Sequence, residues 1–542
     1  MFARLVSLVL AFAALSLAAQ SLQAQSLQAQ SLQAQSLADL AAQASDRAEA
    51  FTLGTTAGGR ALDAVAIGAG DRDEKPALLV LGGIEHDDRA SADAARAFAR
   101  FLVESEADSV RALLDRATVY VVPALALDAH ARADGLPGND APDDADRDGL
   151  TDEDGPDDLD GDGVLRWMRV QHPAGMFADP DDEDAEPLLL REVDDATGDL
   201  GRWLLRPEGR DNDGDGMGDP HHINEDGAGG TWLTRNTTYD HEPYTDKHGR
   251  HPMEAPALRA LADFVFARPN IVAVYTFSRV DNIHYFAEIK GPPRIGRRFA
   301  PDSLAHEATT DALGALARYT GTSTEPPGHL PSWAYYHLGR FSFTAPAWAF
   351  PPADSTDTTD TPSRHDLDRR ALAYLRANDP DAVLDWTEVE HPDLPNRTVE
   401  VGGPAPFALT TPPADSVAAV HDNATTLLFA LAERLPQLDV TARAEPLGRG
   451  VHRVTLTVRN GGDLPTHAVA GRLVQAQQPI LIETDLDDGQ TLAAGRPKQQ
   501  LTAPIPGGGS AEAEMLIVGD GTVTITVGSP SAGVQTVTLD LD

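Results

Sequence analysis

Aspartates on alternate residues form the most chemically distinctive pattern in this 542-residue sequence. Three segments read Asp-x-Asp-x-Asp-Gly. Calcium takes about six to eight oxygen ligands, and this spacing turns successive carboxylates inward while the glycine allows a sharp turn. The segments therefore predict calcium sites. The expected ligands are Asp144, Asp146, Asp148, Asp152 and Asp154 in the first segment, Asp158, Asp160 and Asp162 in the second, and Asp211, Asp213, Asp215 and Asp219 in the third.

A second interpretation of these segments is a solvated acidic loop suited to high salt. None of the three has glutamate at the twelfth position of the loop, so they are not EF-hands in the strict sense. The full spacing nevertheless recurs three times, and this recurrence favours calcium.

Strand-like and helix-like segments alternate through most of the chain, and they must position any site. The apolar runs predict buried strands, because strands covered on both faces read as continuous hydrophobic stretches. This alternation predicts an α/β domain with a mostly parallel sheet. The expected strands are Ala77–Leu81, Thr118–Val122, Ile271–Phe277 and Arg340–Phe343, and the expected helices are Ser91–Val103, Ala255–Ala267 and Asp311–Tyr319.

The last hundred or so residues have a different pattern. Apolar and polar residues alternate at Val454, Leu456 and Val458 and again in two later runs, with glycine-rich turns between them. Alternation with turn signals predicts a C-terminal β-sandwich at about 436–542, which we expect to dock or bind rather than catalyse.

The order of several motifs resembles the zinc carboxypeptidase family typified by carboxypeptidase A. The resemblance covers about residues 49–435 and implies an α/β/α sandwich around a mixed, mainly parallel eight-stranded sheet. The aspartate segments would then form an insertion at about 141–230. The motifs are Gly82-Gly83-Ile84, Trp167-Met168-Arg169-Val170, Thr234-Arg235-Asn236, Ser332-Trp333-Ala334-Tyr335, His391-Pro392 and Val399-Glu400-Val401-Gly402-Gly403.

The family's first two zinc ligands lie in a His-x-x-Glu motif just after the glycine-rich strand end. Aligned on Gly82-Gly83-Ile84, the resemblance places Glu85 where histidine belongs and Asp88 where glutamate belongs. A shift of one residue would restore His86 but would put Arg89 in place of the carboxylate.

The other zinc and catalytic positions are also substituted. The strand that should end with the second histidine reads Tyr275-Thr276-Phe277-Ser278, and Thr276 is its counterpart. Pro346 stands where the family has its catalytic glutamate, and proline carries no group that could activate a metal-bound water. A zinc hydrolase needs a fixed ligand set, an open position and a base. The resemblance therefore implies a scaffold without zinc.

One substrate-binding residue of the family has a counterpart. The Asn-Arg pair that grips the substrate's terminal carboxylate reads Thr234-Arg235 here, so Arg235 is retained. A retained binding group and a structural arginine are both open interpretations. A new metal site among His221, His222, His241, His248 and His251 is a further alternative, although solvated histidines fit an acidic polar loop better.

Composition excludes some partners. The sequence has 43 lysines and arginines against 84 aspartates and glutamates, a net charge of −41, which argues against nucleic acid or an anionic membrane surface. An acidic, self-repelling surface fits a halophilic setting. With no cysteine, disulfides and cysteine-bound metals are excluded.

The N-terminus predicts export. Residues 1–24 combine Arg4, an apolar stretch and small residues at suitable cleavage sites, as in a signal peptide. A pentapeptide repeat follows, and residues 25–48 are interpreted as a low-complexity spacer. After cleavage no integral membrane span is expected. The destination is the periplasm, the cell envelope or the medium.

The sequence leaves two main functions open. The first is a non-catalytic carboxypeptidase-like protein that binds calcium and holds a peptide, a peptidoglycan fragment or a protein partner. The second is an active metallocarboxypeptidase with an atypical site around Glu85, His86 and Asp88. A structural calcium-dependent surface protein differs from the first only in lacking a ligand.

Overall fold

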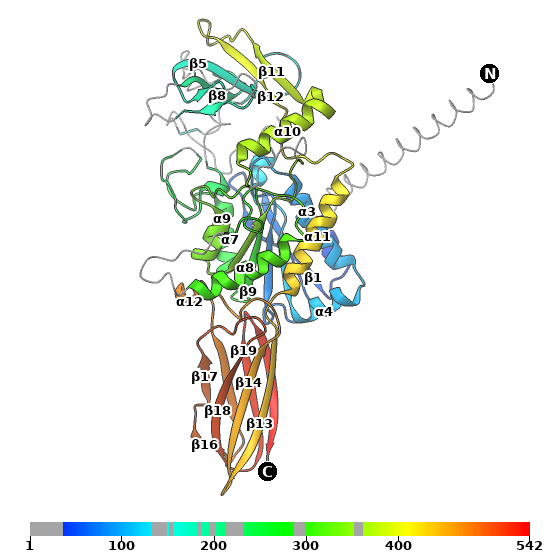
Figure 1. Ribbon diagram of the computed structural model, residues 1–542, viewed down its shortest axis with the longest axis vertical. Helices are drawn as coiled ribbons and strands as arrows, with labels where there is room; N and C mark the ends of the chain where they lie inside the picture. Colours follow the sequence, from blue (N-terminus) through cyan, green and yellow to red (C-terminus); the bar gives the residue numbers. More distant parts are fainter. Residues whose placement is uncertain are drawn as a thin grey trace, which may run out of the picture.

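The chain folds into three bodies stacked end to end (Figure 1). A computed structural model describes residues 36–131, 149–150, 155–181, 186–193, 201–212, 214, 220, 231–245, 247–286, 299–351 and 361–542. We call the central α/β unit the body, residues 155–212 with 383–404 the small lobe, and residues 438–541 the sandwich. The expected signal peptide, residues 1–24, lies outside the described residues.

A mixed sheet forms the centre of the body. Its order is β1-β2-β4-β3-β9-β10, with β3, β4, β9 and β10 mutually parallel and β1 and β2 antiparallel. The expected α/β class with a mixed, mainly parallel sheet is confirmed. The described residues give this sheet six strands rather than eight. The strands are β1 (Ala48–Thr55), β2 (Ala61–Ile67), β3 (Ala77–Leu81), β4 (Thr118–Val122), β9 (Ile271–Phe277) and β10 (Phe341–Ala345).

Helices cover both faces of this sheet, and its central strands are therefore buried throughout. One apolar core joins the sheet to α2, α3, α4, α8 and α11, and a second joins it to α7 and α9. The helices of the body are α2 (Leu37–Ala42), α3 (Ala90–Glu104), α4 (Asp108–Arg116), α5 (Leu127–His130), η2 (Leu233–Arg235), α7 (Pro256–Phe266), α8 (Ala300–Gly314), α9 (Leu330–Tyr336), α10 (Arg364–Asn378), η4 (Pro380–Ala382) and α11 (Val417–Glu433).

Two sequence expectations about the body were wrong. Residues 37–42 form α2 rather than spacer, because Ser36 caps the helix and Leu40 and Ala41 pack into the core. The helix expected at Asp311–Tyr319 is the end of a longer helix, α8, which ends at Gly314. Its buried face includes polar side chains such as Asp302 and His306, so an apolar pattern could not reveal it.

The small lobe is built on a second six-stranded sheet, with the order β11-β12-β5-β8-β6-β7. Val399 pairs with Val170 and Gly402 pairs with Trp167 across β12 and β5, so two of the family-like motifs are neighbouring antiparallel strands. The lobe therefore extends beyond the expected insertion at 141–230. Its strands are β5 (Trp167–Gly175), β6 (Phe177–Ala178), β7 (Arg191–Glu192), β8 (Gly201–Pro207), β11 (Val383–Glu388) and β12 (Val399–Pro404).

The sandwich consists of two four-stranded antiparallel sheets, so the expected C-terminal β-rich domain is confirmed. Asp302 of the body accepts hydrogen bonds from the backbone N–H groups of Val469 and Ala470, at 2.9 and 3.2 Å, which docks helix α12 on the body. The elements are β13 (Leu438–Gly448), β14 (Val451–Asn460), α12 (Val469–Leu473), β15 (Ile480–Leu486), β16 (Thr491–Ala494), β17 (Lys498–Leu501), β18 (Ser510–Val518), β19 (Gly521–Ser529) and β20 (Gly533–Leu541).

None of the helices in the described part of the chain combines the length and apolar character needed to cross a membrane.

Candidate functional site

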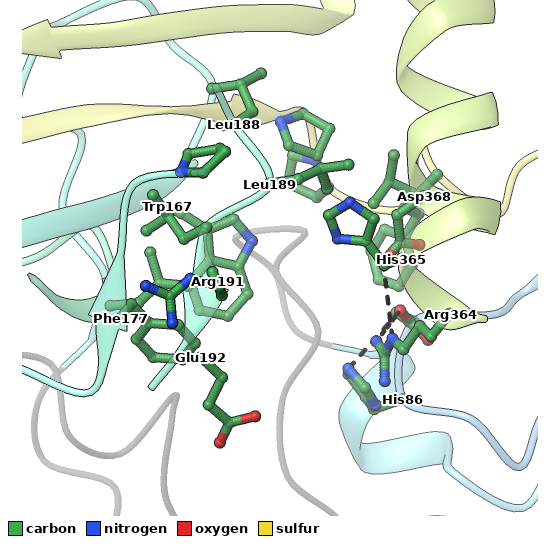
Figure 2. Close-up of a pocket in the computed structure, with 18 of the residues that line it drawn as sticks. His86, Trp167, Phe177, Leu188, Leu189, Arg191, Glu192, Arg364, His365 and Asp368 are labelled. Atoms are coloured by element: carbon green, nitrogen blue, oxygen red, sulfur yellow. Dashed lines mark ion pairs between the residues drawn. The ribbon is translucent and has the colours of Figure 1, made fainter. Parts of the chain in front are cut away.

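A cleft of about 850 Å³ lies between the body and the small lobe. Figure 2 shows His86, Arg364 and Asp368 on one side, and Trp167, Phe177 and Arg191 on the other. The first group comes from the end of β3 and from α10, whereas the second comes from strands of the lobe. The cleft therefore has one largely charged wall and one largely apolar wall.

A tight glycine turn brings the chain from β3 to the cleft. A Cβ at Gly82 would lie 2.6 Å from the carbonyl oxygen of Pro123, and Gly83 has φ +51°. No other residue type fits both positions without displacing the neighbouring strand end. The turn places residues 85–88 at the carboxyl end of the sheet, where open α/β sheets bind ligands.

Glu85 contacts the residue that directly follows strand β9. The Ser278 hydroxyl donates to Glu85 Oε1 at 2.8 Å. Thr276, expected at this point, is fully buried two residues earlier, and its hydroxyl has no hydrogen-bond partner among the described residues. Side chains of a strand alternate between faces, so Ser278 lies on the same face as Thr276 but further toward the cleft. The resemblance implied Thr276 as the counterpart of the second histidine, and the residue that contacts Glu85 is Ser278, two positions later.

Pro346 is close to the same point. The Ser278 N–H donates to the carbonyl of Ala345 at 3.3 Å, so Pro346 follows directly after a residue that contacts the end of β9. The structure therefore brings Glu85, Ser278 and Pro346 into one region. Here the Glu85 carboxylate is hydrogen-bonded directly to the Ser278 hydroxyl.

Arg279 lies next to this region and balances the charge of two neighbouring carboxylates. Arg279 pairs with Asp87 and, at 3.8 Å, with Asp368 of α10. Arg364 approaches the same two carboxylates at 3.9 and 3.8 Å. Burial alone would raise the pKa of Asp87, but Arg279, His86 and Arg364 together lower it below the ordinary range. Two guanidinium groups thus supply the positive charge at this end of the sheet.

His86 is held in an aromatic stack. The ring centroids of His86 and Trp232 lie 3.6 Å apart, and the Lys247 ammonium lies 4.3 Å from the Trp232 ring centroid. Burial lowers the pKa of His86 to about 3, so the imidazole is neutral near pH 7. His86 is therefore an uncharged part of the cleft wall near pH 7.

Asp88 performs a structural task. Its Oδ1 accepts a hydrogen bond from the Ser91 N–H at 3.1 Å, which caps the first turn of α3. Burial raises the pKa of Asp88 to about 6, against the lowering effect of this hydrogen bond.

The residues at 85–88 do not fit a zinc site. Among the described residues, Asp158, Asp160 and Asp162 are the one set of three or more histidines or carboxylates whose ligand atoms lie within 4.8 Å of one another. Glu85 is bonded to Ser278, Asp87 to Arg279 and Asp88 to Ser91. Zinc needs about four ligands converging on one point, and these three carboxylates are each committed elsewhere.

The second aspartate loop does fit calcium. Asp158 accepts the N–H groups of Gly161 and Gly163 at 2.7 and 2.9 Å, which folds the loop back on itself. Both glycines have positive φ, +76° and +85°. The carboxylates of Asp158, Asp160 and Asp162 consequently gather on one side, as an oxygen-only calcium site requires.

The third loop lies beside the second. Asn212 Nδ2 donates to Asp157 at 3.0 Å, and Asp211 Oδ1 accepts from the Gly214 N–H at 2.7 Å. Of the other expected calcium ligands, Asp213, Asp215 and Asp219 of this loop and Asp144, Asp146, Asp148, Asp152 and Asp154 of the first loop lie outside the described residues.

Sequence reasoning missed Glu208, which lies behind the second loop. Its side chain is fully buried, and Oε1 accepts from the Arg166 N–H at 3.1 Å. Burial, together with the charges of Asp160 and Asp158, raises the pKa of Glu208 to about 7. The available signal was a glutamate three residues before Asp211, between two aspartate loops. A cation on the loops would stabilise its ionised form.

Arg235, the substrate-binding counterpart implied by the resemblance, is one of the residues that line the cleft. It ends the short helix η2 and lines the cleft. Gly328 has φ +74°, and a Cβ there would lie 2.0 Å from the Arg235 carbonyl, so the chain passes closely behind Arg235. The side chain is therefore carried by a rigidly packed backbone.

Comparisons with known proteins support the resemblance. Residues 34–141 match the family model described as zinc carboxypeptidase, and residues 438–540 match a domain of unknown function (DUF8731). No curated protein matches the sequence. The expected resemblance to zinc carboxypeptidases is thus confirmed, and the family model spans the segment that contains Glu85 and Asp88.

Solved structures of carboxypeptidases are among the similar folds, at low similarity. Bovine thrombin-activatable fibrinolysis inhibitor has 12% identity and a TM-score of 0.35, covering 73% of this chain and 93% of that one. Carboxypeptidase A from Helicoverpa armigera has 12% identity and a TM-score of 0.33, covering 63% and 72%. A metallo-carboxypeptidase from Pseudomonas aeruginosa has 11% identity and a TM-score of 0.30, covering 73% and 67%.

Proposed function

The chain contains a zinc-carboxypeptidase-like domain, and on that premise we propose that it is an exported binding protein without zinc-dependent hydrolysis. Its ligand would be peptide in character: a free peptide, the peptide part of a peptidoglycan fragment, or an exposed protein segment. The ligand would lie in the cleft between the body and the small lobe.

The arginine network at the end of β9 is the observation that carries this proposal. Arg279 and Arg364 already balance Asp87 and Asp368. A zinc ion placed beside them would add positive charge next to two guanidinium groups, which costs free energy in a partly buried site. The two guanidinium groups therefore supply the positive charge that a metal cation would otherwise supply to these carboxylates.

The proposed loss of hydrolysis also follows from the missing base. Activating a water molecule requires a group that can accept a proton within hydrogen-bond reach of it. Pro346 offers none, and the neighbouring Glu85 already accepts the Ser278 hydroxyl. The alternative, an active metallocarboxypeptidase at Glu85, His86 and Asp88, would require these side chains to leave their present partners.

The cleft is suited to a peptide. Its volume of about 850 Å³ lies in the range of small-ligand sites, about 300–1,000 Å³. Trp167 and Phe177 offer apolar surface on the lobe side, and Arg235 lies on the body side. An arginine can bind a carboxylate through two parallel hydrogen bonds, so a free carboxyl terminus is the chemical group that we expect it to recognise.

We also propose that calcium binds the aspartate loops of the lobe. The gathered carboxylates of Asp158, Asp160 and Asp162 and the buried Glu208 behind them support this assignment. Calcium would then stabilise the lobe that forms one wall of the cleft, and so support ligand binding indirectly.

A fluorescence titration tests the function. Trp167 and Trp232 both line the cleft, so a bound peptide should change the tryptophan emission. We expect saturable binding of a synthetic pentapeptide with a free carboxyl terminus, and binding about tenfold weaker for its C-terminal amide. Arg235→Gln should abolish this difference, and Trp167→Phe should reduce the signal.

The same peptides incubated with added zinc and followed by mass spectrometry complete the test. We expect them to remain intact. Zinc-dependent removal of the last residue would establish the alternative function instead, and the absence of binding for every peptide would overturn the proposed ligand class.

A further inference from the structure

A second cavity, of about 320 Å³, lies in the body and shares no lining residue with the cleft. It lies beside α9 and the segment after β9. Neither the aspartate loops nor the arginine network reaches it. Its chemistry is therefore independent of the function proposed above.

Aromatic rings form much of its wall. Tyr239 and Tyr336 are stacked with 5.2 Å between ring centroids and an interplanar angle of 12°. Tyr335 meets Tyr336 edge to face at 4.9 Å. Tyr285 and Phe286 line the same cavity. Faces of such rings carry negative electrostatic potential and attract cations that have lost part of their water.

The acidic residues in the described lining of the cavity give it negative charge. Asp281 and Glu325 line it, and among its described lining residues there is no lysine or arginine. Asp281 is fully buried and already bonded to His284 at 2.7 Å. The Glu325 side chain is 42% exposed and accepts the Ser332 hydroxyl at 2.6 Å, so it is the carboxylate that a ligand can approach.

His306 adds polarity to the cavity without adding charge. Its Nε2 lies 2.7 Å from the Ser342 carbonyl oxygen, and because a carbonyl only accepts, Nε2 must carry the proton. Burial lowers the pKa of His306 to about 4, so the ring is neutral near pH 7. Nδ1 of His306 and Oγ of Ser342 are buried without a hydrogen-bond partner among the described residues. Unpaired buried polar atoms are uncommon in proteins and mark places where a water or a ligand bonds.

We propose that this cavity binds a small organic cation, such as a primary alkylammonium group, held by the tyrosine walls and by the Glu325 carboxylate. The contrast with the cleft supports this assignment, since Arg191, Arg235, Lys247 and Arg364 line the cleft, whereas the described lining of the cavity has no such side chain. The aromatic walls select against small inorganic cations, which keep their water and gain little from a ring face.

Titration calorimetry with n-butylammonium chloride tests the site, with 1-butanol as the uncharged probe of the same length. We expect one butylammonium per chain and no saturable binding of butanol. Glu325→Gln keeps the side-chain shape and the acceptor for Ser332 while removing the charge, and should weaken butylammonium binding about tenfold. Tyr336→Leu should weaken it by a similar factor.

Glu445→Gln is the matched control, because Glu445 is an exposed carboxylate of the sandwich far from the cavity. It should leave the affinity unchanged. Equal binding of butylammonium and butanol would overturn the proposal, as would an affinity that is insensitive to Glu325→Gln. Weakening by Asp368→Asn instead, a carboxylate that lines the cleft, would place the cation in the cleft and also overturn it. None of these outcomes depends on whether peptides bind.

Discussion

The body and the small lobe form opposite walls of one cleft, yet they are stabilised by different forces. The body buries two extensive apolar cores on the two faces of its sheet. Among its described residues, the lobe has one small core of five buried apolar side chains, which are Met168, Val170, Leu394, Val399 and Val401. Burial of apolar surface is the main source of folding free energy, so the lobe must rely on other contacts.

Charged groups supply those contacts in the lobe. Arg169 lies between the rings of Trp203 and Trp386, at 4.1 and 4.8 Å from their centroids. It also pairs with Glu400 and, at 2.8 Å, with Asp179. These interactions join strands from opposite ends of the lobe's sequence. The body wall of the cleft is thus stabilised mainly by apolar packing, whereas the lobe wall is stabilised largely by ionic contacts, including the proposed calcium.

Removal of calcium should affect the largest part of the structure, and it should affect only one wall. A chelator would leave Asp158, Asp160 and the buried Glu208 as mutually repelling carboxylates, with Asp162 paired to Arg166 at 3.2 Å. We expect hydrogen exchange in β5 and β8 to accelerate at least about tenfold while β3 and β4 stay protected. Magnesium should restore protection poorly, because it demands a smaller octahedral site. Equal acceleration in both regions would remove the distinction between them.

Breaking the arginine network should have the next largest effect, this time in the body. Arg279→Met leaves Asp87 largely buried without its main partner, and should lower the free energy of unfolding by about 3–5 kcal/mol. The double variant Asp87→Asn with Arg279→Met should recover most of that loss. Denaturant unfolding measures both.

Arg364→Met is the control for this experiment. Arg364 is 52% exposed and 3.9 Å from Asp87, so its loss should cost less than about 1 kcal/mol. Similar costs for Arg279→Met and Arg364→Met would show that the network is a surface feature.

Asp88→Asn should stabilise the body, in a pH-dependent way. The folded-state pKa of Asp88, about 6, lies above its ordinary value, so its contribution to stability is largest at low pH and is lost as the pH rises through about 6. Asparagine cannot ionise and still accepts the Ser91 N–H. We expect a gain on the order of 2 kcal/mol at pH 8 and almost none at pH 4, measured by thermal unfolding.

The exposed Asp108 at the start of α4 provides the control for Asp88, and Asp108→Asn should give no gain at pH 8. A loss of stability in Asp88→Asn at pH 8 would indicate that the ionised carboxylate has a favourable partner, as a metal ligand would.

Glu208→Gln should have the smallest effect, with a sign that depends on calcium. Without calcium the substitution removes a buried charge near Asp158 and Asp160, and should stabilise the lobe by about 1 kcal/mol. With calcium it removes a nearby negative charge, and should weaken calcium affinity severalfold in calorimetry. The exposed Glu192 on β7 is the matched control, and Glu192→Gln should change neither quantity. A stabilising effect under both conditions would separate Glu208 from the calcium site.

The sequence predicted those parts of the fold that have a local signal. Ala77–Leu81, Thr118–Val122 and Ile271–Phe277 are largely apolar runs, and the structure has strands with these same bounds. The pairing of β12 with β5 carries no such signal, because it joins residues more than two hundred positions apart. The lobe could therefore not be assembled from local patterns.

The same distinction applies to the site. The substitutions at Glu85, Asp88 and Pro346 could be read from motif order, but the partners of those residues could not. Arg279 is the main example, because its significance depends on Asp87 and Asp368, which come from distant segments. An arginine two residues after the end of a buried strand was the available hint.

The most direct test of the account is a count of metals bound to the purified protein after exposure to calcium and zinc and extensive dialysis. Elemental analysis of wild type should show retained calcium and no stoichiometric zinc, since the aspartate loops fit calcium and residues 85–88 do not fit zinc. One tightly held zinc per chain, lost in Asp88→Asn, would contradict the central claim and identify the end of β3 as a working metal site.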